Sequence, residues 1–302
     1  MRYIKNFESV KNTFNISNGN LSEVTYNLTG MTLGEFDCSY NSIVRLPELP
    51  EGLLILNCER NQLIELPKLP KSLKRLQCAV NNLQYLPELQ KIETLECYRN
   101  QLTKLPKLPY GLRSLFCLDN KLTTLPELLP PTLETLNCDK NLLSVLPNLP
   151  NHLTKLRCSN NKIIILPTLP EKMRMLYCSA NLLRELPTLH EGLFLLDCTN
   201  NNIENLPELP ESLEKLECSG NMLTVLPELP EELTLLSCSN NKLKYLPRLP
   251  KDITILNCYG NNLPYIDLDE YRKWVSDNSE LIETEGWIGA HELYMDKGEF
   301  NL

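Results

Sequence analysis

The stretch Leu76-Gln77-Cys78-Ala79-Val80-Asn81-Asn82-Leu83 carries the pattern Leu-x-Cys-x-x-Asn-x-Leu, which recurs along most of the 302-residue chain. Each copy is followed by Leu-Pro-x-Leu-Pro, or a close variant of it, and then by the next copy. Twelve cysteines mark the copies, and an asparagine stands three residues after every one of them, from Asn41 to Asn261. Neighbouring cysteines are 20 residues apart, except for a step of 19 after Cys78 and a step of 21 after Cys117. A period this regular predicts a solenoid built from one repeated unit.

The apolar positions within each copy indicate one short parallel strand per repeat. Because successive side chains of a strand point to opposite faces, we expect the leucine and cysteine of Leu-x-Cys to point inward and the residues around them outward. Proline fixes φ and lacks an N–H, so two prolines three residues apart favour an extended or polyproline-like return path over a helix. The predicted fold is a leucine-rich repeat solenoid, a horseshoe or superhelix with its strands on the concave face and capping segments at both ends.

The repeat pattern divides the chain into three parts. Residues 1–30 are predicted to form an N-terminal cap with one degenerate repeat, in which Ile16 replaces cysteine and Gly19 replaces asparagine. Residues 31–266 form twelve repeats of about 20 residues. Residues 267–302 are expected to be an acidic, partly helical C-terminal cap. Its first helix would begin at Asp267 or Asp269 and lay an apolar face over the last repeat. Four apolar residues near the start are expected to cover the opposite end as a helix or a strand: Tyr3, Ile4, Phe7 and Val10.

Composition and charge exclude several classes of function. The formal net charge is −8, and the segment after Asn262 holds ten acidic and three basic residues, a net charge of −7. The repeats are therefore nearly neutral, which argues against a nucleic-acid partner that would need a dense basic stripe. No apolar stretch is long enough to span a membrane, and the N-terminus has no secretory signal. We therefore expect a cytoplasmic protein, with a host cytoplasm as one candidate, whose cysteines stay free thiols.

The repeated polar residues are predicted to be structural. The cysteines stand in single file without a Cys-x-x-Cys pair, so we expect buried packing and neither a metal site nor a catalytic thiol. The asparagine amide can donate and accept between successive repeats, which suits a ladder inside the stack. His152, His190 and His291 are far apart in sequence, and no phosphate loop or nucleophile elbow is present. The sequence thus predicts no enzyme activity, cofactor, metal or small-molecule substrate.

The outward strand positions vary between repeats and are the candidates for function. At both ends of the repeat array they are small and polar, whereas the middle carries aromatic residues, methionine, leucine and arginine, a composition that is typical of interface centres. Tyr98 and Phe116 are expected to be lateral neighbours on adjacent strands. Asn137 and Asp139 interrupt the set, so it forms either one patch or two. The predicted partner-binding residues are Tyr98, Arg99, Phe116, Leu118, Arg157, Met175, Tyr177 and Leu195.

The repeat resembles the short "LPX" class of leucine-rich repeats, as in Leu226-Pro227-Glu228-Leu229-Pro230 followed by Leu236-Ser237-Cys238. That class is known from bacterial effector proteins that are delivered into host cells. Cysteine in the third consensus slot also makes the chain similar to repeat proteins of giant viruses. Some bacterial members carry a C-terminal ubiquitin-ligase domain with a catalytic cysteine. This chain has no cysteine after Cys258, so the resemblance does not extend to that activity.

These observations together predict a non-enzymatic scaffold that binds a partner protein, one candidate being a host protein, through the concave face of the solenoid. In one alternative, the chain is an adaptor or spacer whose acidic C-terminal segment docks a basic partner. In another, it is the substrate-recognition subunit of a separate ubiquitin ligase.

Overall fold

The computed structural model describes residues 12–296. The chain divides into two compact units, Met1–Leu153 and Thr154–Leu302, and each is treated separately below. The N-terminal residues Tyr3, Ile4, Phe7 and Val10, for which a helix or a strand was expected, lie outside the described part of the chain.

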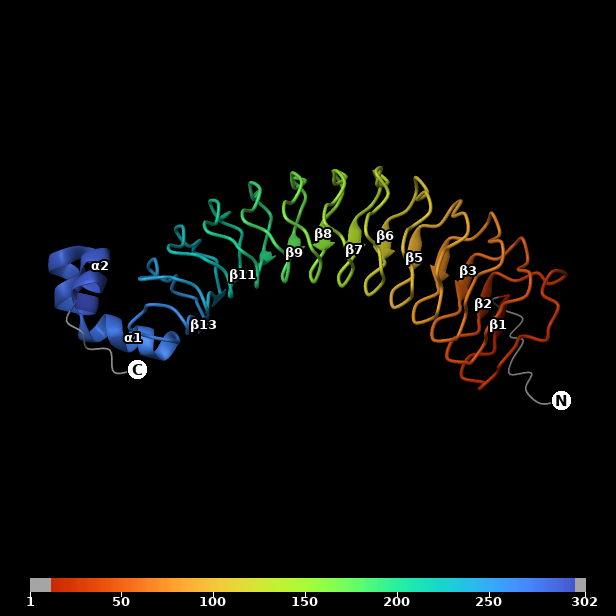
Figure 1. Cartoon of the computed structure of the whole chain (residues 1–302), viewed down its shortest axis with the longest axis horizontal. Helices are drawn as coiled ribbons and strands as arrows, with labels where there is room; N and C mark the ends of the chain where they lie inside the picture. The colour runs from red at the N-terminus through yellow and green to blue at the C-terminus, as the bar shows by residue number, and fades with distance from the viewer. Residues whose placement is uncertain (1–11, 297–302) are drawn as a thin grey trace. The chain divides into compact units, whose positions relative to one another are not determined.

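The first unit contains seven strands of three residues each, which follow one another in sequence order and pair in parallel (Figure 1). Each strand consists of the three residues before a cysteine, or before Ile16 in the degenerate repeat. This arrangement confirms the predicted leucine-rich repeat fold. The strands are β1 (Thr13–Asn15), β2 (Glu35–Asp37), β3 (Ile55–Asn57), β4 (Arg75–Gln77), β5 (Thr94–Glu96), β6 (Ser114–Phe116) and β7 (Thr135–Asn137).

Strand register places the same repeat position on every strand in line. Leu76, for example, pairs with Leu56 on one side and Leu95 on the other, and all three side chains are fully buried. The residues before and after the central residue of each strand are partly exposed, apart from Arg75 and Asn15, which are exposed. The alternation predicted for Leu-x-Cys is therefore present. It gives the unit a core of stacked leucines and cysteines and one outward-facing side of the sheet.

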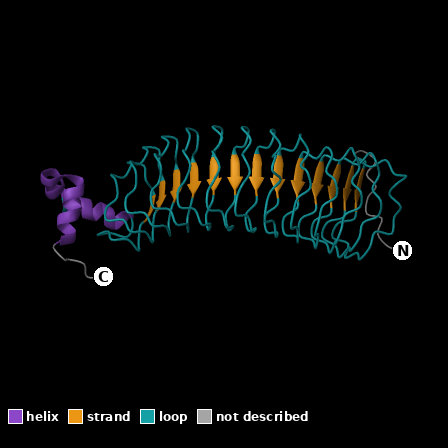
Figure 2. Cartoon of the chain, turned by 45° about the horizontal axis from the view of Figure 1, so that its top comes forward, coloured by secondary structure: helices purple, strands orange, loops and turns teal. Residues whose placement is uncertain are grey.

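The return path of each repeat contains neither helix nor strand within residues 12–153 (Figure 2). A turn leads back into the next strand, and in it the Leu73 N–H donates to the Pro70 carbonyl at 3.1 Å. The 21-residue step after Cys117 adds its extra residue here. Leu129 lies in the slot of the second leucine, and Leu128 is pushed out to 83% exposure. The inserted residue changes the surface and leaves strand register intact, because β6 still pairs with β7 leucine to leucine.

The degenerate repeat at the N-terminal end is stacked in the same register as the others. Phe14 pairs with Phe36, and the two rings stack with their centroids 5.6 Å apart. Ile16 is buried in the cysteine slot. Gly19, in the asparagine slot, donates its N–H to the Asn41 side chain at 3.0 Å.

The second unit repeats this architecture with six parallel strands. They are β8 (Lys155–Arg157), β9 (Met175–Tyr177), β10 (Leu195–Asp197), β11 (Lys215–Glu217), β12 (Leu235–Ser237) and β13 (Ile255–Asn257). After β13 the chain folds back, and the Ile266 carbonyl accepts the Cys258 N–H at 3.1 Å, which occupies part of the open edge of this strand.

Two helices follow, α1 (Leu268–Asp277) and α2 (Ser279–Asp296), the second kinked at Gly286. Asp267 caps α1 by accepting the Glu270 N–H at 3.0 Å, which is one of the two caps predicted. Tyr271 and Trp274 form the buried side of α1. Within residues 12–296, neither helix has the length and the apolar character that a membrane crossing requires.

Candidate partner-binding face

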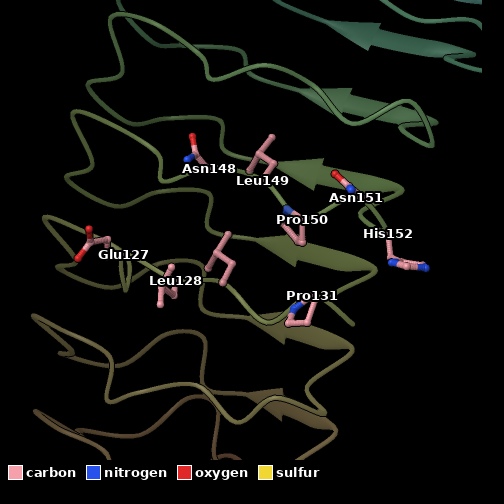
Figure 3. Close-up of a pocket in the computed structure, with 9 residues that line it drawn as sticks. Glu127, Leu128, Pro131, Asn148, Leu149, Pro150, Asn151 and His152 are labelled. Carbon is pink, nitrogen blue, oxygen red and sulfur yellow. The ribbon is translucent and has the colours of Figure 1, made fainter.

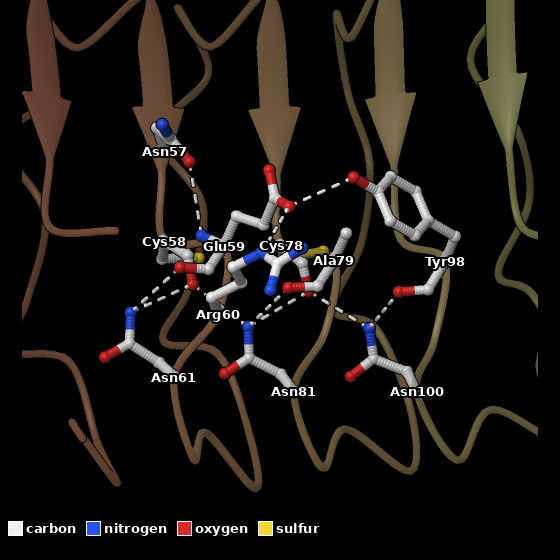
Figure 4. A network of polar contacts seen from close by, with 10 residues as sticks. All are labelled: Asn57, Cys58, Glu59, Arg60, Asn61, Cys78, Ala79, Asn81, Tyr98 and Asn100. Carbon is white, nitrogen blue, oxygen red and sulfur yellow. Dashed lines mark hydrogen bonds and ion pairs between the residues drawn. The ribbon is translucent and has the colours of Figure 1, made fainter. Parts of the chain in front are cut away.

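The asparagine ladder fixes the backbone immediately after each strand (Figure 4). The Asn81 amide Nδ2 donates to the carbonyls of Cys78 and Ala79 in its own repeat and to that of Cys58 in the preceding repeat, at 3.0–3.2 Å. Its Oδ1 accepts the Leu63 N–H at 2.9 Å. The amide thus donates and accepts between repeats as predicted. Side chains at neighbouring positions are held on a rigid backbone because the same bonds recur from Asn61 to Asn100.

The cysteine ladder offers no accessible nucleophile. All twelve cysteines are free and buried. Burial is the main cause that raises the pKa of Cys117 to about 12, so its thiolate is almost absent at neutral pH. No group of three or more His, Cys, Asp or Glu side chains within residues 12–296 is arranged to hold a metal ion.

We define the strand face as the outward positions three and one residues before, and one and two residues after, each cysteine. The predicted site residues all occupy such positions, four in each unit. Tyr98, Arg99, Phe116 and Leu118 belong to the first unit, and Arg157, Met175, Tyr177 and Leu195 belong to the second.

In the first unit, Tyr98 is the best-anchored side chain of the strand face. Its hydroxyl passes beside the buried Ala79 and donates to a Glu59 carboxylate oxygen at 3.0 Å, two repeats away (Figure 4). Partial burial, followed by this hydrogen bond, raises the pKa of Tyr98 to about 12. Arg60 lies 3.6 Å from the same carboxylate. The ring is thus fixed in one orientation, which lowers the conformational entropy lost on binding.

The expected lateral contact between Tyr98 and Phe116 is wrong. Phe116 is the last residue of β6, and its partners in register are Glu96 and Asn137. Tyr98 follows its cysteine and lies beyond the end of β5, level with Leu118, whose carbonyl accepts the N–H of Arg99. The two aromatic residues are therefore diagonal, because Tyr98 follows its cysteine whereas Phe116 precedes its own.

In the second unit, Tyr177 lies beneath two cations. The Arg157 guanidinium is 4.3 Å and the Lys155 ammonium 6.0 Å from the ring centroid, both within cation–π range. Asp197 and Glu217 continue the row in register. Burial, followed by the charge of Asp197, raises the pKa of Glu217.

Met175 is partly exposed, as predicted, whereas Leu195 is only 8% exposed. Leu195 lies between Met175 and Lys215 in register. The prediction of Leu195 as an exposed contact is therefore wrong.

Sequence reasoning did not recognise the backbone conformation of one row of the strand face, which we name the left-handed edge. It consists of the residue two positions after each cysteine, where φ is between +51° and +66° from Tyr40 to Gly260. A left-handed conformation costs an ordinary L-residue about 1–2 kcal/mol, and asparagine or glycine much less. The signal was visible in the sequence as Asn or Gly before the invariant asparagine in the later repeats. In the first unit this edge consists of Tyr40, Arg60, Val80, Arg99, Asp119 and Lys140.

A shallow groove of about 470 Å³ lies on the return path of the first unit, beside the inserted Leu128 (Figure 3). It is lined by Leu128, Leu129, Pro131, Leu149 and Pro150, with His152 at the rim. The only ionisable side chains of the lining are Glu127 and His152, and they share no hydrogen bond or ion pair, so the groove holds no assembled catalytic pair.

No protein-family model and no curated protein matches the chain. Among solved structures, the chain is similar to YopM from Yersinia enterocolitica, with 35% identity and a TM-score of 0.74 over 81% of this chain. It spans only 58% of that protein. It is also similar to YopM from Yersinia pestis, described as a leucine-rich effector protein, with 30% identity and a TM-score of 0.66 over 84% of both chains.

A third similar structure is the functional domain of InlJ from Listeria monocytogenes, which includes a cysteine ladder. At 23% identity, with a TM-score of 0.58 over 83% of this chain and 68% of that one, it shows the shared fold alone. The repeat pattern, the strand stack and the identity to the Yersinia pestis protein agree: the chain belongs to the family of leucine-rich repeat proteins that includes YopM.

Proposed function

We propose that the chain binds a partner protein through its strand face and has no catalytic activity of its own. Leucine-rich repeat proteins of this kind serve as scaffolds for protein–protein interaction. The observation that carries the proposal is the fixed presentation of two aromatic side chains on the strand face. Tyr98 is held by Glu59, and Tyr177 is stacked under Arg157. Ordered aromatic residues beside arginine are the usual anchors of protein interfaces.

The similarity to YopM supports a host-directed role, in which the chain acts as an effector in the cytoplasm of a host cell. The resemblance to repeat proteins of giant viruses supports a viral form of the same hypothesis, with a partner in the infected cell.

The test is affinity capture from a eukaryotic cytosolic extract with three versions of the chain. The strand-face triple is Tyr98→Asp, Phe116→Asp and Tyr177→Asp. Its matched control carries the same change at exposed apolar positions outside the strand face: Tyr85→Asp, Tyr110→Asp and Ile165→Asp. We expect a protein that the wild type and the control retain and the strand-face triple loses. Equal retention by all three, with equal thermal unfolding midpoints, would rule out the strand face as the binding site.

A second candidate function, docking of a basic partner by the acidic C-terminal segment, is favoured by the exposure of Glu280, Glu283 and Glu285. Changing these three residues to glutamine removes three charges and keeps side-chain size. Loss of the captured protein from this variant alone would assign binding to the C-terminal segment. In the third alternative, a substrate-recognition role, a ubiquitin ligase would appear among the captured proteins.

A further inference from the structure

The left-handed edge differs in composition between the two units. In the second unit it consists of Asn160, Ala180, Asn200, Gly220, Asn240 and Gly260, so five of the six are residues that tolerate positive φ well. In the first unit none of the six is asparagine or glycine, although their φ angles, between +52° and +56°, are the same. Val80 is the clearest outlier, because a β-branched residue rarely adopts this conformation.

Folding does not explain this difference. Both units make the same turn, with the same backbone hydrogen bonds: the Arg60 N–H donates to the Ala79 carbonyl and the Asn200 N–H to the Ser219 carbonyl, at 2.9 and 2.8 Å. Asparagine or glycine would therefore serve equally well in the first unit. Strain that the fold does not require points to a role for the side chains themselves.

The exposed charges on this edge are mostly positive. Arg60, Arg99 and Lys140 are exposed, and Asp119 is the one exposed acid. The row of residues one position after each cysteine contains two acids, and both are shielded from solvent. The Glu59 side chain is 15% exposed beneath Tyr98 and Arg60, and Asp139 is 6% exposed. Arg99 lies 3.6 Å from Asp119, and Arg60 lies 3.6 Å from the covered Glu59, so the exposed charged side chains of the edge (three cations and one anion) carry a net charge of +2.

Apolar surface lies between these cations. Tyr40 is half exposed, with the Arg60 guanidinium 5.2 Å from its ring centroid, and Val80 stands between Arg60 and Arg99. Alternating basic and apolar side chains suit a chain segment that presents carboxylates with apolar residues between them.

We propose that the left-handed edge of the first unit binds an acidic segment of the partner protein. This inference rests on the proposed function and adds the chemistry of the partner. The three exposed basic residues supply charge complementarity to carboxylates, and Tyr40 and Val80 supply apolar contact.

The test uses a charge-removing triple, Arg60→Asn, Arg99→Asn and Lys140→Asn, which also relieves strain. Its matched control is Lys68→Asn, Lys104→Asn and Lys107→Asn. These three lysines are exposed, lie on the return path and do not have a positive φ. The probe is a fluorescein-labelled poly-glutamate peptide, and binding is followed by fluorescence anisotropy at low and physiological salt. We expect the left-handed-edge triple to bind at least about tenfold more weakly than the control.

The same triple should unfold at a higher temperature than the wild type, by at least about 3 °C. If the triple binds the peptide more weakly but is more stable than the wild type, the loss of binding cannot be due to a damaged fold. Equal binding by the two triples, or no binding of the probe by the wild type, would overturn the proposal.

Two further outcomes are separated by partner capture and by sedimentation. If the left-handed-edge triple still captures the partner that the strand-face triple loses, the proposed function stands and this inference is wrong. If neither triple loses the partner, the proposed function itself is wrong. Wild-type dimers that are lost both in the left-handed-edge triple and in the Glu280→Gln, Glu283→Gln and Glu285→Gln variant would show that the edge binds the acidic segment of a second copy. That result would also overturn the inference.

Discussion

At the scale of single residues, the asparagine after each strand satisfies buried backbone groups that no other side chain reaches. Asn81 is 7% exposed and makes four hydrogen bonds to backbone groups of two successive repeats. Neither a hydroxyl nor a carboxylate could replace it, because the site needs two N–H donors and one acceptor on the same planar group.

We predict that Asn81→Ala lowers the free energy of unfolding by about 3 kcal/mol or more, because it leaves a buried N–H of Leu63 and buried carbonyls without partners. Denaturant unfolding followed by circular dichroism measures this change. Asn82→Ala is the control: Asn82 is exposed, and its substitution should change stability by less than about 0.5 kcal/mol. A similar loss in both variants would contradict the structural role of the ladder.

The strain at Val80 gives a prediction of opposite sign. Val80→Asn keeps the left-handed turn and replaces a β-branched side chain by a short polar one that tolerates this conformation, so stability should rise by about 1 kcal/mol. The reverse change in the second unit, Asn160→Val, should lower stability by a similar amount. Both values come from denaturant unfolding. An unchanged or lower stability for Val80→Asn would mean that valine is not strained at this turn.

At the scale of elements, a series of hydrogen bonds fastens α2 to the last two repeats. Trp287 Nε1–H donates to the Leu246 carbonyl at 2.6 Å. Tyr265 Oη lies 3.0 Å from His291 Nε2, and His291 Nδ1 lies 2.8 Å from the Trp287 carbonyl. Since a carbonyl only accepts, Nδ1 carries the proton, and Nε2 accepts the Tyr265 O–H.

This series of bonds requires a neutral His291. Protonation would place a second N–H against Tyr265, whose hydroxyl proton would then lose its acceptor. The buried imidazole is packed against Trp274, with ring centroids 4.0 Å apart, and lies 1% exposed. Burial lowers the pKa of His291, and the hydrogen bond to Trp287 only partly opposes this effect.

We predict that the helical cap loses stability in mild acid. The pKa of His291 is lower in the folded chain than its unfolded value of about 6.5, so stability is full above that pH and falls as the pH drops below it. Both tryptophans of the chain, Trp274 and Trp287, lie in the cap, so their fluorescence reports the cap alone. The urea midpoint of this signal should be lower at a pH of about 5.5 than at about 7.5.

Two variants test the assignment to His291. His291→Phe keeps a ring beside Trp274 and removes the titrating group, so its midpoint should be lower at neutral pH and nearly independent of pH over the same interval. His152→Gln changes an exposed histidine of the first unit and should keep the wild-type pH dependence. A pH dependence that survives in His291→Phe would assign the effect to another group.

At the scale of the whole molecule, the features that recur in every repeat were predictable. The strand positions, the buried leucine and cysteine, the asparagine bonds and the non-helical return path each follow from a pattern that the chain states many times. Asp267 was predictable as a cap because capping depends on local sequence. Local patterns and repeated ones need no knowledge of distant contacts.

The features that occur once were not predictable in the same way. The bond between Tyr265 and His291 joins residues 26 positions apart, and nothing in the sequence pairs them. Leu195 is buried between Met175 and Lys215 in register, and the repeat pattern does not define how these three side chains pack. By contrast, the diagonal placement of Tyr98 and Phe116 could have been predicted, because one follows its cysteine and the other precedes its own. The left-handed edge had a sequence signal, but a backbone angle was needed to show that its composition carries a cost.

The buried thiols give a prediction that covers both units. Burial raises the pKa of each cysteine for which a shift is resolved, to about 12 for Cys117 in the first unit and for Cys258 in the second. At a pH of about 8, only about one in 10⁴ such thiols is ionised, so the native chain should react with a thiol reagent far more slowly than the unfolded chain. In denaturant all twelve cysteines should react. Rapid reaction of several thiols in the native chain would contradict the buried ladder.

The order in which the cysteines react with the reagent should follow the order in which parts of the chain unfold. Cys258 is covered by the segment that leads into the cap, with its Sγ 3.6 Å from the Tyr265 carbonyl and its N–H bonded to the Ile266 carbonyl. A urea concentration that changes the tryptophan signal before the circular dichroism of the repeats should therefore expose Cys258 first. Mass spectrometry of labelled peptides identifies the cysteine. First labelling at Cys117, which is interior to its unit, would show instead that the repeats open before the cap does.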